Sequence, residues 1–229
     1  MAAIIKKESL EFLKKLKKNN NREWFNKNKD TYTEAHENIA EFADALIREM
    51  NKHDEIETTT GKQSLMRIYR DVRFSKEKTP YNTHWSGGMK RATRKLRGGY
   101  YFHIEPGNTF LAGGFWGPNT EDLKRIRQDI DFNYKDWEKM LAGKSLKKTF
   151  GEMRGEQLGS APRGYAKDHP GIALLRYKQF IFRHDFTDEE VYAADFAQKM
   201  SKVYKDMRPF LDFMSDVLTT DMNGVSIVD

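Results

Sequence analysis

The spacing of apolar residues changes twice along this chain, and that change limits the folds it can adopt. In residues 32–50, apolar side chains recur every three or four positions between Ile39 and Met50, which predicts an amphipathic helix. The same spacing returns from Phe196 to Val217. Between these segments, aromatic-rich runs at 98–105 and 109–117 are typical of strands. Helical ends around a strand-rich middle favour an α+β fold over an alternating α/β fold.

We therefore predict one α+β domain over residues 1–229, with a mainly antiparallel sheet flanked by N-terminal and C-terminal helices. The N-terminal helices are expected at about 5–52, the strand-rich middle with short helices at about 64–184, and the C-terminal helices at about 187–222. An apolar content of 38% is enough for a core of this size.

Local signals refine this prediction in the middle and at the end of the chain. The Pro-Gly pair at 106–107 suits a type II turn, so the two aromatic runs should pair as a hairpin. The Gly-Gly pair at 113–114 indicates a bulge or a close backbone approach. Thr187 and Glu190 form a capping-box pattern at the start of a helix, and Pro209 should kink the last helix or begin a new one.

Positive charge is concentrated in one segment. The whole chain has a formal net charge of +6, but residues 61–104 hold eleven basic and two acidic side chains, a net charge of +9, and the rest carries −3. A local excess of this kind attracts anions to one surface. Cysteine is absent, which excludes disulfides and thiolate chemistry. The chain has no long apolar run and no signal-peptide pattern, so we expect a cytoplasmic protein that does not enter a membrane.

The segment at 66–74, MRIYRDVRF, alternates as a strand would. Met66, Ile68, Val72 and Phe74 are expected on one apolar face. Arg70 falls on that face, where a guanidinium needs a carboxylate partner or a polar opening. A buried ion pair and a ligand contact both explain Arg70, and the sequence leaves the two open.

Three blocks of sequence resemble a known family: RIYRDVRFSKEKTPYNTH, GGYYFHIEPGNTFLAGGFWGP and PRGYAKDHPGIALLRYKQF. They are similar to the bacterial and fungal family called domain of unknown function 2461, and the resemblance begins near Phe12 and extends to the C-terminal helices. It implies one compact α+β domain and brings no activity, substrate or cofactor. It suggests that the family's motif includes Arg67, Arg70, Asp71, Arg73, Phe74, Lys78, Pro80 and Tyr81.

Two cation-rich segments form the candidate site. Lys76 and Lys78 are expected beside Tyr81 at a turn, and a second group of cations follows at 163–178. We predict that both segments line one cleft that binds a phosphorylated or carboxylated small molecule, because arginine forks suit such oxygens. The candidate residues are Arg67, Arg70, Arg73, Lys76, Lys78, Tyr81, Arg163, His169, Arg176 and Lys178. Solvated loop lysines and a backbone-bound His169 are the simpler readings of those residues.

Two other functions fit the same residues. A nucleic-acid-binding module would use the first segment and a further group of cations, Lys90, Arg91, Arg94, Lys95 and Arg97. A structural or interaction protein would use its arginines only in ion pairs. His103 and Glu105 share a strand face but have no third ligand nearby, so we expect no metal, and no cofactor is indicated. The common nucleotide and hydrolase motifs are absent, which leaves open whether the chain is an enzyme, and nothing indicates its oligomeric state.

Overall fold

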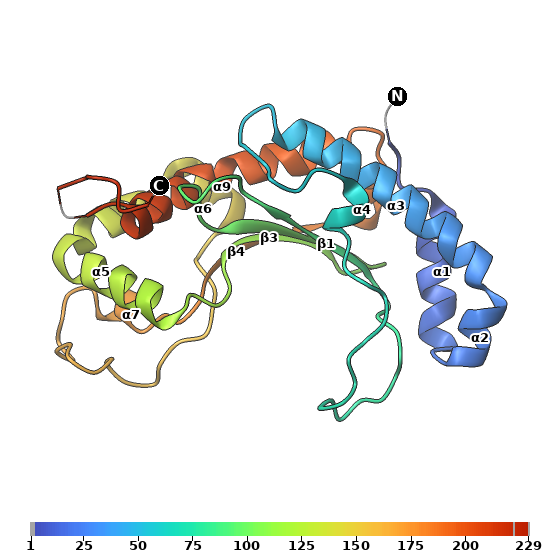
Figure 1. Cartoon of the computed structure of the whole chain (residues 1–229), viewed down its shortest axis with the longest axis horizontal. Coiled ribbons are helices and arrows are strands. Elements are labelled where there is room, and N and C mark those ends of the chain that lie inside the picture. Colours follow the sequence, from blue (N-terminus) through green and yellow to red (C-terminus); the bar gives the residue numbers. More distant parts are fainter. Residues whose placement is uncertain (1–2, 222, 229) are drawn as a thin grey trace. The chain divides into compact units, whose positions relative to one another are not determined.

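The computed structural model of the chain describes residues 3–221 and 223–228 and has an α+β fold (Figure 1). The described residues form a four-stranded antiparallel sheet in the order β1-β2-β3-β4. Its strands are β1 (Trp85–Lys90), β2 (Gly99–Ile104), β3 (Thr109–Phe115) and β4 (Phe180–Phe186). The predicted fold class is confirmed, as is the predicted pairing of β2 with β3.

Helices precede, interrupt and follow the sheet, in the order that the apolar spacing predicts. The helices before the sheet are α1 (Lys7–Lys18), α2 (Arg22–Lys27), α3 (Lys29–Met50) and α4 (Gly61–Ser64). Those between β3 and β4 are α5 (Thr120–Leu141), α6 (Lys144–Phe150) and α7 (Ile172–Leu175). The last are α8 (Asp188–Val191) and α9 (Phe196–Thr219). None of the described helices combines the length and the hydropathy that are needed to cross a lipid bilayer.

The chain forms two compact units, and each is assembled from three separate segments. Unit 1 comprises Met1–Lys90, Tyr101–Leu111 and Asp185–Lys202, and unit 2 comprises Arg91–Tyr100, Ala112–His184 and Val203–Asp229. Strands β2, β3 and β4 therefore each contain residues of both units. The expectation of a single domain over 1–229 stays a prediction.

The core of unit 1 is built on the apolar stripe of α3. Ile39, Phe42 and Leu46 are fully buried, as the helical spacing predicts. Phe42 stacks on Phe196 at a centroid distance of 5.5 Å and meets Phe102 edge-on at 6.5 Å. Burying one such side chain contributes about 1.5–3 kcal/mol, so this stripe is a main source of stability.

The core of unit 2 surrounds Trp137, which is fully buried and contacts Phe180 and Phe213. Its indole N–H donates a 2.6 Å hydrogen bond to Asp129, so the one polar atom of the ring is satisfied. Arg91 is also buried in this unit, where its guanidinium pairs with Asp212.

The predicted turn and caps are present. Gly107 has a φ of +75°, and the N–H of Asn108 donates to the carbonyl of Glu105 at 2.9 Å, as a type II turn requires. Thr187 and Glu190 form the predicted capping box, but α8 ends at Val191 and a separate helix begins at Phe196. Pro209 lies inside α9 and does not begin a new helix.

The prediction of a strand over residues 66–74 is wrong. This segment has only isolated antiparallel bridges, between Leu65 and Gly87 and between Tyr69 and Tyr81. Phe74, expected on an apolar face, is 96% exposed. Alternation alone does not make a strand, because a strand also needs a continuous partner and a layer that covers its apolar side. Strand β1, which follows this segment, was not predicted.

Candidate functional site

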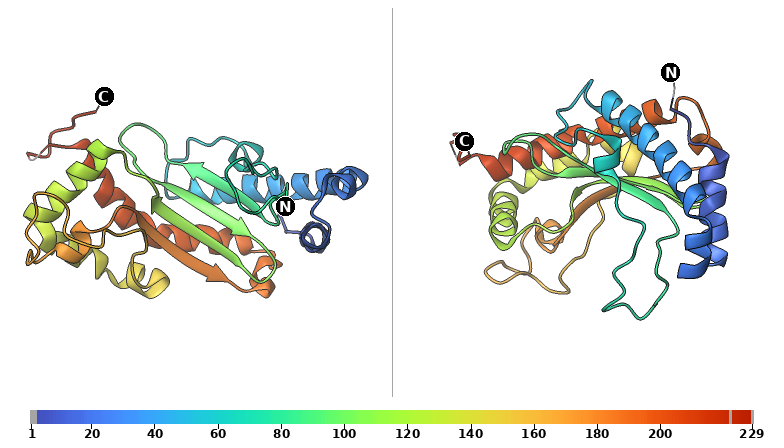
Figure 2. Two further views of the ribbon diagram at one scale, coloured as in Figure 1. Left: turned by 90° about the horizontal axis from the view of Figure 1, so that it is seen from below. Right: turned by 45° about the vertical axis from the view of Figure 1, so that its right-hand side comes forward.

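Residues 66–82 form a looped segment that projects from the fold beside α1 and α2, and we call it the cationic arm (Figure 1; Figure 2, right). Its two legs are joined by backbone hydrogen bonds. The N–H of Arg70 donates to Pro80 at 2.9 Å, and the N–H of Asn82 donates to Ile68 at 2.7 Å. The arm is therefore tied at its base, while its tip from Asp71 to Lys78 extends outward.

Tyr81 anchors the arm to the helices of unit 1. Its side chain is buried, and its ring stacks on Phe25 at a centroid distance of 4.0 Å. Asn20 holds the Tyr81 backbone at both ends, accepting from its N–H at 3.1 Å and donating to its carbonyl at 2.9 Å. Burial raises the pKa of Tyr81. The ring that was expected beside Lys76 and Lys78 thus belongs to the aromatic core at the base of the arm.

Several cations of the arm have partners within the arm itself. Arg73 makes a bidentate pair with Asp71, with its Nη2 2.6 Å from Oδ2, and this pair lowers the pKa of Asp71. Arg70 lies 3.1 Å from Glu77 and donates to Thr79 at 2.5 Å. The Lys78 ammonium donates to the Val72 carbonyl at 2.9 Å. Exposed pairs of this kind are weak because water screens them, so an incoming anion can replace them.

Arg67 and Lys76 differ from the other cations of the arm because their side chains are not paired within it. Both are exposed, and neither side chain has a hydrogen-bond or ion-pair partner in the part of the chain that the structure describes. The backbone carbonyl of Arg67 accepts from the Asn82 side chain at 3.3 Å, which fixes the main chain at this point. Arg67 therefore presents, from an anchored backbone, a guanidinium without a direct partner, although its charge is near enough to Asp71 to help lower the pKa of that carboxyl.

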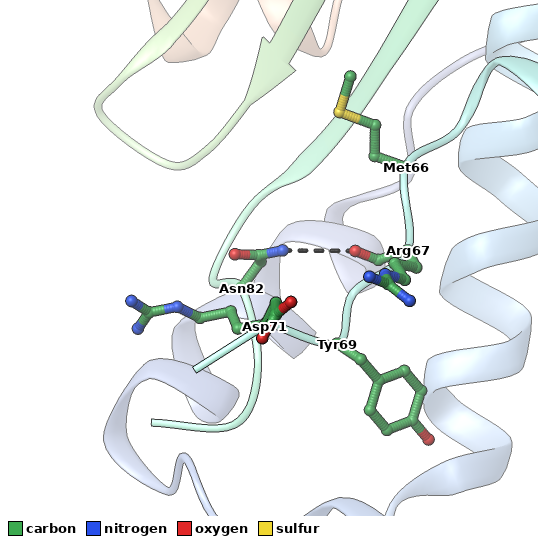
Figure 3. Close-up of a pocket in the computed structure, with 6 residues that line it drawn as sticks. Met66, Arg67, Tyr69, Asp71 and Asn82 are labelled. Atoms are coloured by element: carbon green, nitrogen blue, oxygen red, sulfur yellow. Dashed lines mark hydrogen bonds between the residues drawn. The ribbon is translucent and has the colours of Figure 1, made fainter. Parts of the chain in front are cut away.

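A shallow cavity of about 500 Å³, wide open to solvent, lies along the arm (Figure 3). Its lining residues are Met66, Arg67, Tyr69, Arg70, Asp71 and Asn82. A smaller cavity of about 280 Å³ lies where the arm meets α2, lined in part by Arg22 and Asn26. Tyr69 and Arg70 line both cavities, so they are placed to contact a ligand in either.

The second cationic segment, at 163–178, lies in unit 2. Arg176 donates to the Leu158 carbonyl at 2.6 Å, and Lys178 pairs with Glu156 at 2.7 Å. His169 accepts from the N–H of Gly171 at 2.9 Å and lies 3.0 Å from Asp131. Arg163 is exposed, without a partner among the described residues. Because the two cationic segments belong to different units, the cleft that they were expected to share stays a prediction.

The cations that were expected to extend the basic patch toward nucleic acid are mostly engaged elsewhere. Arg91 is buried against Asp212 and Ser215, so it cannot contribute to a surface. Arg97 pairs with Asp122 at 2.5 Å. Counting Arg91 as surface charge was wrong, because the sequence does not reveal its acidic partner, Asp212, on the distant helix α9.

A row of polar side chains crosses one face of β2, and we call it the Tyr-His-Glu row. Tyr101, His103 and Glu105 alternate with Tyr100, Phe102 and Ile104, whose side chains are buried in the core. The Tyr101 hydroxyl lies 3.3 Å from Nδ1 of His103, and Nε2 of His103 lies 3.3 Å from Glu105. All three members of the row belong to unit 1.

Neighbouring groups set the protonation of this row. Burial raises the pKa of Tyr101. Burial also acts to raise the pKa of Glu105, but hydrogen bonds from Asn108, His103 and Lys17 outweigh it and lower the pKa. The His84 ring lies 4.1 Å from the ring of His103. Burial, followed by the charge of His103, lowers the pKa of His84 to about 4.

Sequence reasoning found only part of this row. The sequence placed His103 and Glu105 on one strand face without a third metal ligand, and it did not predict that the two side chains bond to each other at 3.3 Å. Among residues 3–221 and 223–228, no three His, Asp or Glu side chains are grouped to hold a metal ion. Tyr101 lies two residues before His103, so the alternation of a strand places it on the same face. This spacing was the sequence signal from which Tyr101 could have been predicted as a member of the row. The contact with His84 depends on tertiary structure and has no sequence signal.

The chain was compared with protein-family models, with curated proteins and with solved structures. A family model described as a conserved hypothetical protein, DUF2461, matches residues 8–213. Searches of curated proteins and of solved structures found no match.

Proposed function

Since the chain belongs to the conserved hypothetical protein family DUF2461, we propose its function from the site itself: it binds a phosphorylated or carboxylated small molecule on the cationic arm. The observation that carries this proposal is Arg67. Arg67 lines a cavity of about 500 Å³, and its side chain has no hydrogen-bond or ion-pair partner among the described residues, although the Asp71 carboxylate lines the same cavity. A charge-assisted hydrogen bond to such a group contributes about 1.5–3 kcal/mol, which is enough to select an anion.

Arg70 supplies the second cation. It lines the same cavity as Arg67, and its present partner, Glu77, has a side chain that is 66% exposed. An anion in the cavity would replace this solvated carboxylate with little loss. Tyr69 and the amide of Asn82 line the same cavity and offer a ring face and hydrogen-bonding groups. Together these residues supply charge, shape and polar contacts for a ligand of metabolite size.

Titration calorimetry with inorganic phosphate, pyrophosphate and citrate tests this proposal. We expect Arg67→Gln to weaken binding of the best anion about tenfold, which corresponds to ~1.4 kcal/mol. Arg48→Gln is the matched control, because it removes one exposed arginine from α3, away from the cavity. Equal affinity of the wild type and Arg67→Gln for all three anions would contradict the proposal. Arg163→Gln tests separately whether the second cationic segment takes part.

One observation favours nucleic acid as a second candidate ligand. Phe74 is 96% exposed at the tip of the arm, and the guanidinium of Arg73 lies 5.9 Å from its ring centroid. An exposed ring beside cations can stack on a base while the cations contact phosphate, and such stacking contributes about 1–3 kcal/mol per base.

The anisotropy of a fluorescent oligothymidine, measured at several salt concentrations, tests this second function. We expect Phe74→Ala to weaken binding, while Phe132→Ala, which removes a 68% exposed phenylalanine from α5, leaves it unchanged. A steep dependence of affinity on salt should accompany binding, because several phosphates would be contacted. Equal effects of the two substitutions would remove this candidate.

A further inference from the structure

We propose that the Tyr-His-Glu row is a proton-transfer site, in which Tyr101 contacts a substrate and His103 receives the proton. This inference deepens the proposed function and rests on it. The substrate would be the small anion held by the arm, and it would carry an acidic O–H or C–H group. Tyr101 is then the catalytic residue, while His103 and Glu105 act through it as positioning residues.

The geometry of His103 determines the direction of transfer. Glu105 accepts a hydrogen bond from Nε2 of His103 at 3.3 Å, which places the imidazole proton on that nitrogen. Nδ1 then carries a lone pair, and it lies 3.3 Å from the hydroxyl oxygen of Tyr101. The phenol is therefore the donor and the imidazole the acceptor, the arrangement in which a base activates a hydroxyl.

The proposed step conserves protons and charge. The hydroxyl proton of Tyr101 moves to Nδ1 of His103, and the Tyr101 oxygen takes a proton from the substrate O–H or C–H. The products are a substrate anion, a neutral tyrosine and an imidazolium. The carboxylate of Glu105 stabilises that imidazolium by direct contact, as a carboxylate does beside a catalytic histidine.

The surroundings keep each group in the form that this step requires. Burial raises the pKa of Tyr101, which keeps the phenol protonated at rest and opposes its deprotonation, while a hydrogen bond with Ser86 acts in the opposite direction and favours the transfer. The pKa of Glu105 is lowered on balance by its hydrogen bonds, which keeps it ionised. His84 has a pKa of about 4, so it stays neutral at pH 7 and adds no charge beside His103.

Two contacts and one electrostatic interaction connect the row to the arm. Asn82 lines the larger cavity, and the next residue, Thr83, donates to Glu105 at 3.5 Å. Arg70 lines that cavity and is close enough to His84 to lower its pKa. The His84 ring in turn lies 4.1 Å from the His103 ring, at an interplanar angle of 31°. The cavity is thus linked to the row through Glu105 and through His84, within unit 1, and a substrate held by Arg67 and Arg70 would have to extend from the cavity to reach Tyr101.

Chemical labelling tests the row without a known substrate. Phenylmethanesulfonyl fluoride forms an O–S bond with an activated tyrosine and releases fluoride, while His103 takes the phenol proton. Tyr192 is the internal reference, because it is half-buried, burial raises its pKa too, and no histidine is bonded to it in the described residues. We expect Tyr101 to be labelled at least tenfold faster than Tyr192, as quantified by peptide mass spectrometry. Labelling of Tyr192 at the same or a higher rate would overturn the proposal.

Variants then identify the base. His103→Gln should reduce labelling of Tyr101 at least tenfold, and Glu105→Gln should reduce it less. His36→Gln is the matched control, because His36 is half-buried and contacts aromatic rings without a hydrogen bond to a tyrosine hydroxyl in the described chain. Unchanged labelling of Tyr101 in folded His103→Gln, checked by circular dichroism, would refute the role of His103.

A pH profile keeps the test decisive if His103→Gln does not fold. In the wild type, the labelling rate of Tyr101 should decrease in acid over the same pH range in which NMR shows the His103 ring gaining a proton. The labelling rate of Tyr192 should depend only on the hydroxide concentration. Parallel profiles for the two tyrosines would overturn the proposal.

The link to the arm has its own readout. Pyrophosphate should slow labelling of Tyr101, and Arg67→Gln should remove this protection. Rapid labelling that pyrophosphate does not slow would refute the assignment of the substrate to the arm and leave the proton-transfer site standing. If the wild type binds none of the three anions in calorimetry, the proposed anion-binding function is refuted, while the labelling of Tyr101 still tests the proton-transfer site. The failure of one proposal can therefore be told from the failure of the other.

Discussion

A neutral imidazole beside His103 and Arg70 makes the stability of the folded chain depend on pH. Burial, then the charge of His103, lowers the pKa of His84 to about 4 from 6.5, while Glu105 acts in the opposite direction. As the pH falls from 6.5 toward 4, the unfolded chain binds a proton that the folded chain does not. The contribution of His84 to the free energy of unfolding is therefore fully present above pH 6.5, and it is lost as the pH falls from 6.5 toward 4.

We expect this effect to reach about 1–2 kcal/mol, less than the full pKa difference implies, because part of the ring is exposed to solvent. Urea unfolding of the wild type and His84→Gln at pH 8, 6.5, 5.5 and 4.5 measures it. The wild type should lose more stability than the variant between pH 6.5 and 4.5, and the difference between the two should be constant above pH 7. Parallel curves over the whole range would contradict the prediction.

At the scale of elements, β3 depends on one glycine that approaches the neighbouring strand. Gly114 has a φ of +126°, and a Cβ there would lie 2.1 Å from the carbonyl oxygen of Phe180 in β4. Gly114→Ala should lower the free energy of unfolding by at least about 2 kcal/mol, because it combines strain with a backbone clash. Gly117→Ala, where a Cβ meets nothing within 4 Å, should change it by less than about 0.5 kcal/mol. Similar urea midpoints for the two variants would disprove this account.

Elements whose signals are local could be predicted, and those that depend on distant partners could not. The stripe of α3, the turn at Gly107 and the Thr187 capping box are each encoded within a few residues, and all three are present. The segment at 66–74 has an equally clear alternation, but its legs pair only at isolated bridges and nothing covers Phe74. In the candidate site, too, local features could be predicted from the sequence and distant partners could not. The sequence indicated its cations, but it did not indicate which carboxylates neutralise them.

At the scale of the whole molecule, the path of the chain predicts how it unfolds. Each compact unit is assembled from three segments, and β2, β3 and β4 each contain residues of both units. Disrupting either unit therefore removes part of these strands, and a shortened strand loses ladder hydrogen bonds along its remaining length. We expect the chain to unfold as one cooperative domain, as the sequence predicts, with one midpoint for both units.

The tryptophans report on the two units separately. Trp24 and Trp85 lie in unit 1, and Trp116 and Trp137 lie in unit 2. A protein in which both tryptophans of one unit are replaced by phenylalanine follows the other unit by fluorescence, and its far-UV circular dichroism follows the whole chain. Because both signals come from the same protein, any destabilisation by the substitutions affects them equally. In each of the two proteins, the fluorescence and dichroism curves in urea should coincide in midpoint and slope. Separate midpoints, with fluorescence of one unit lost before that of the other, would mean that the units unfold independently and that the prediction of a single domain is wrong.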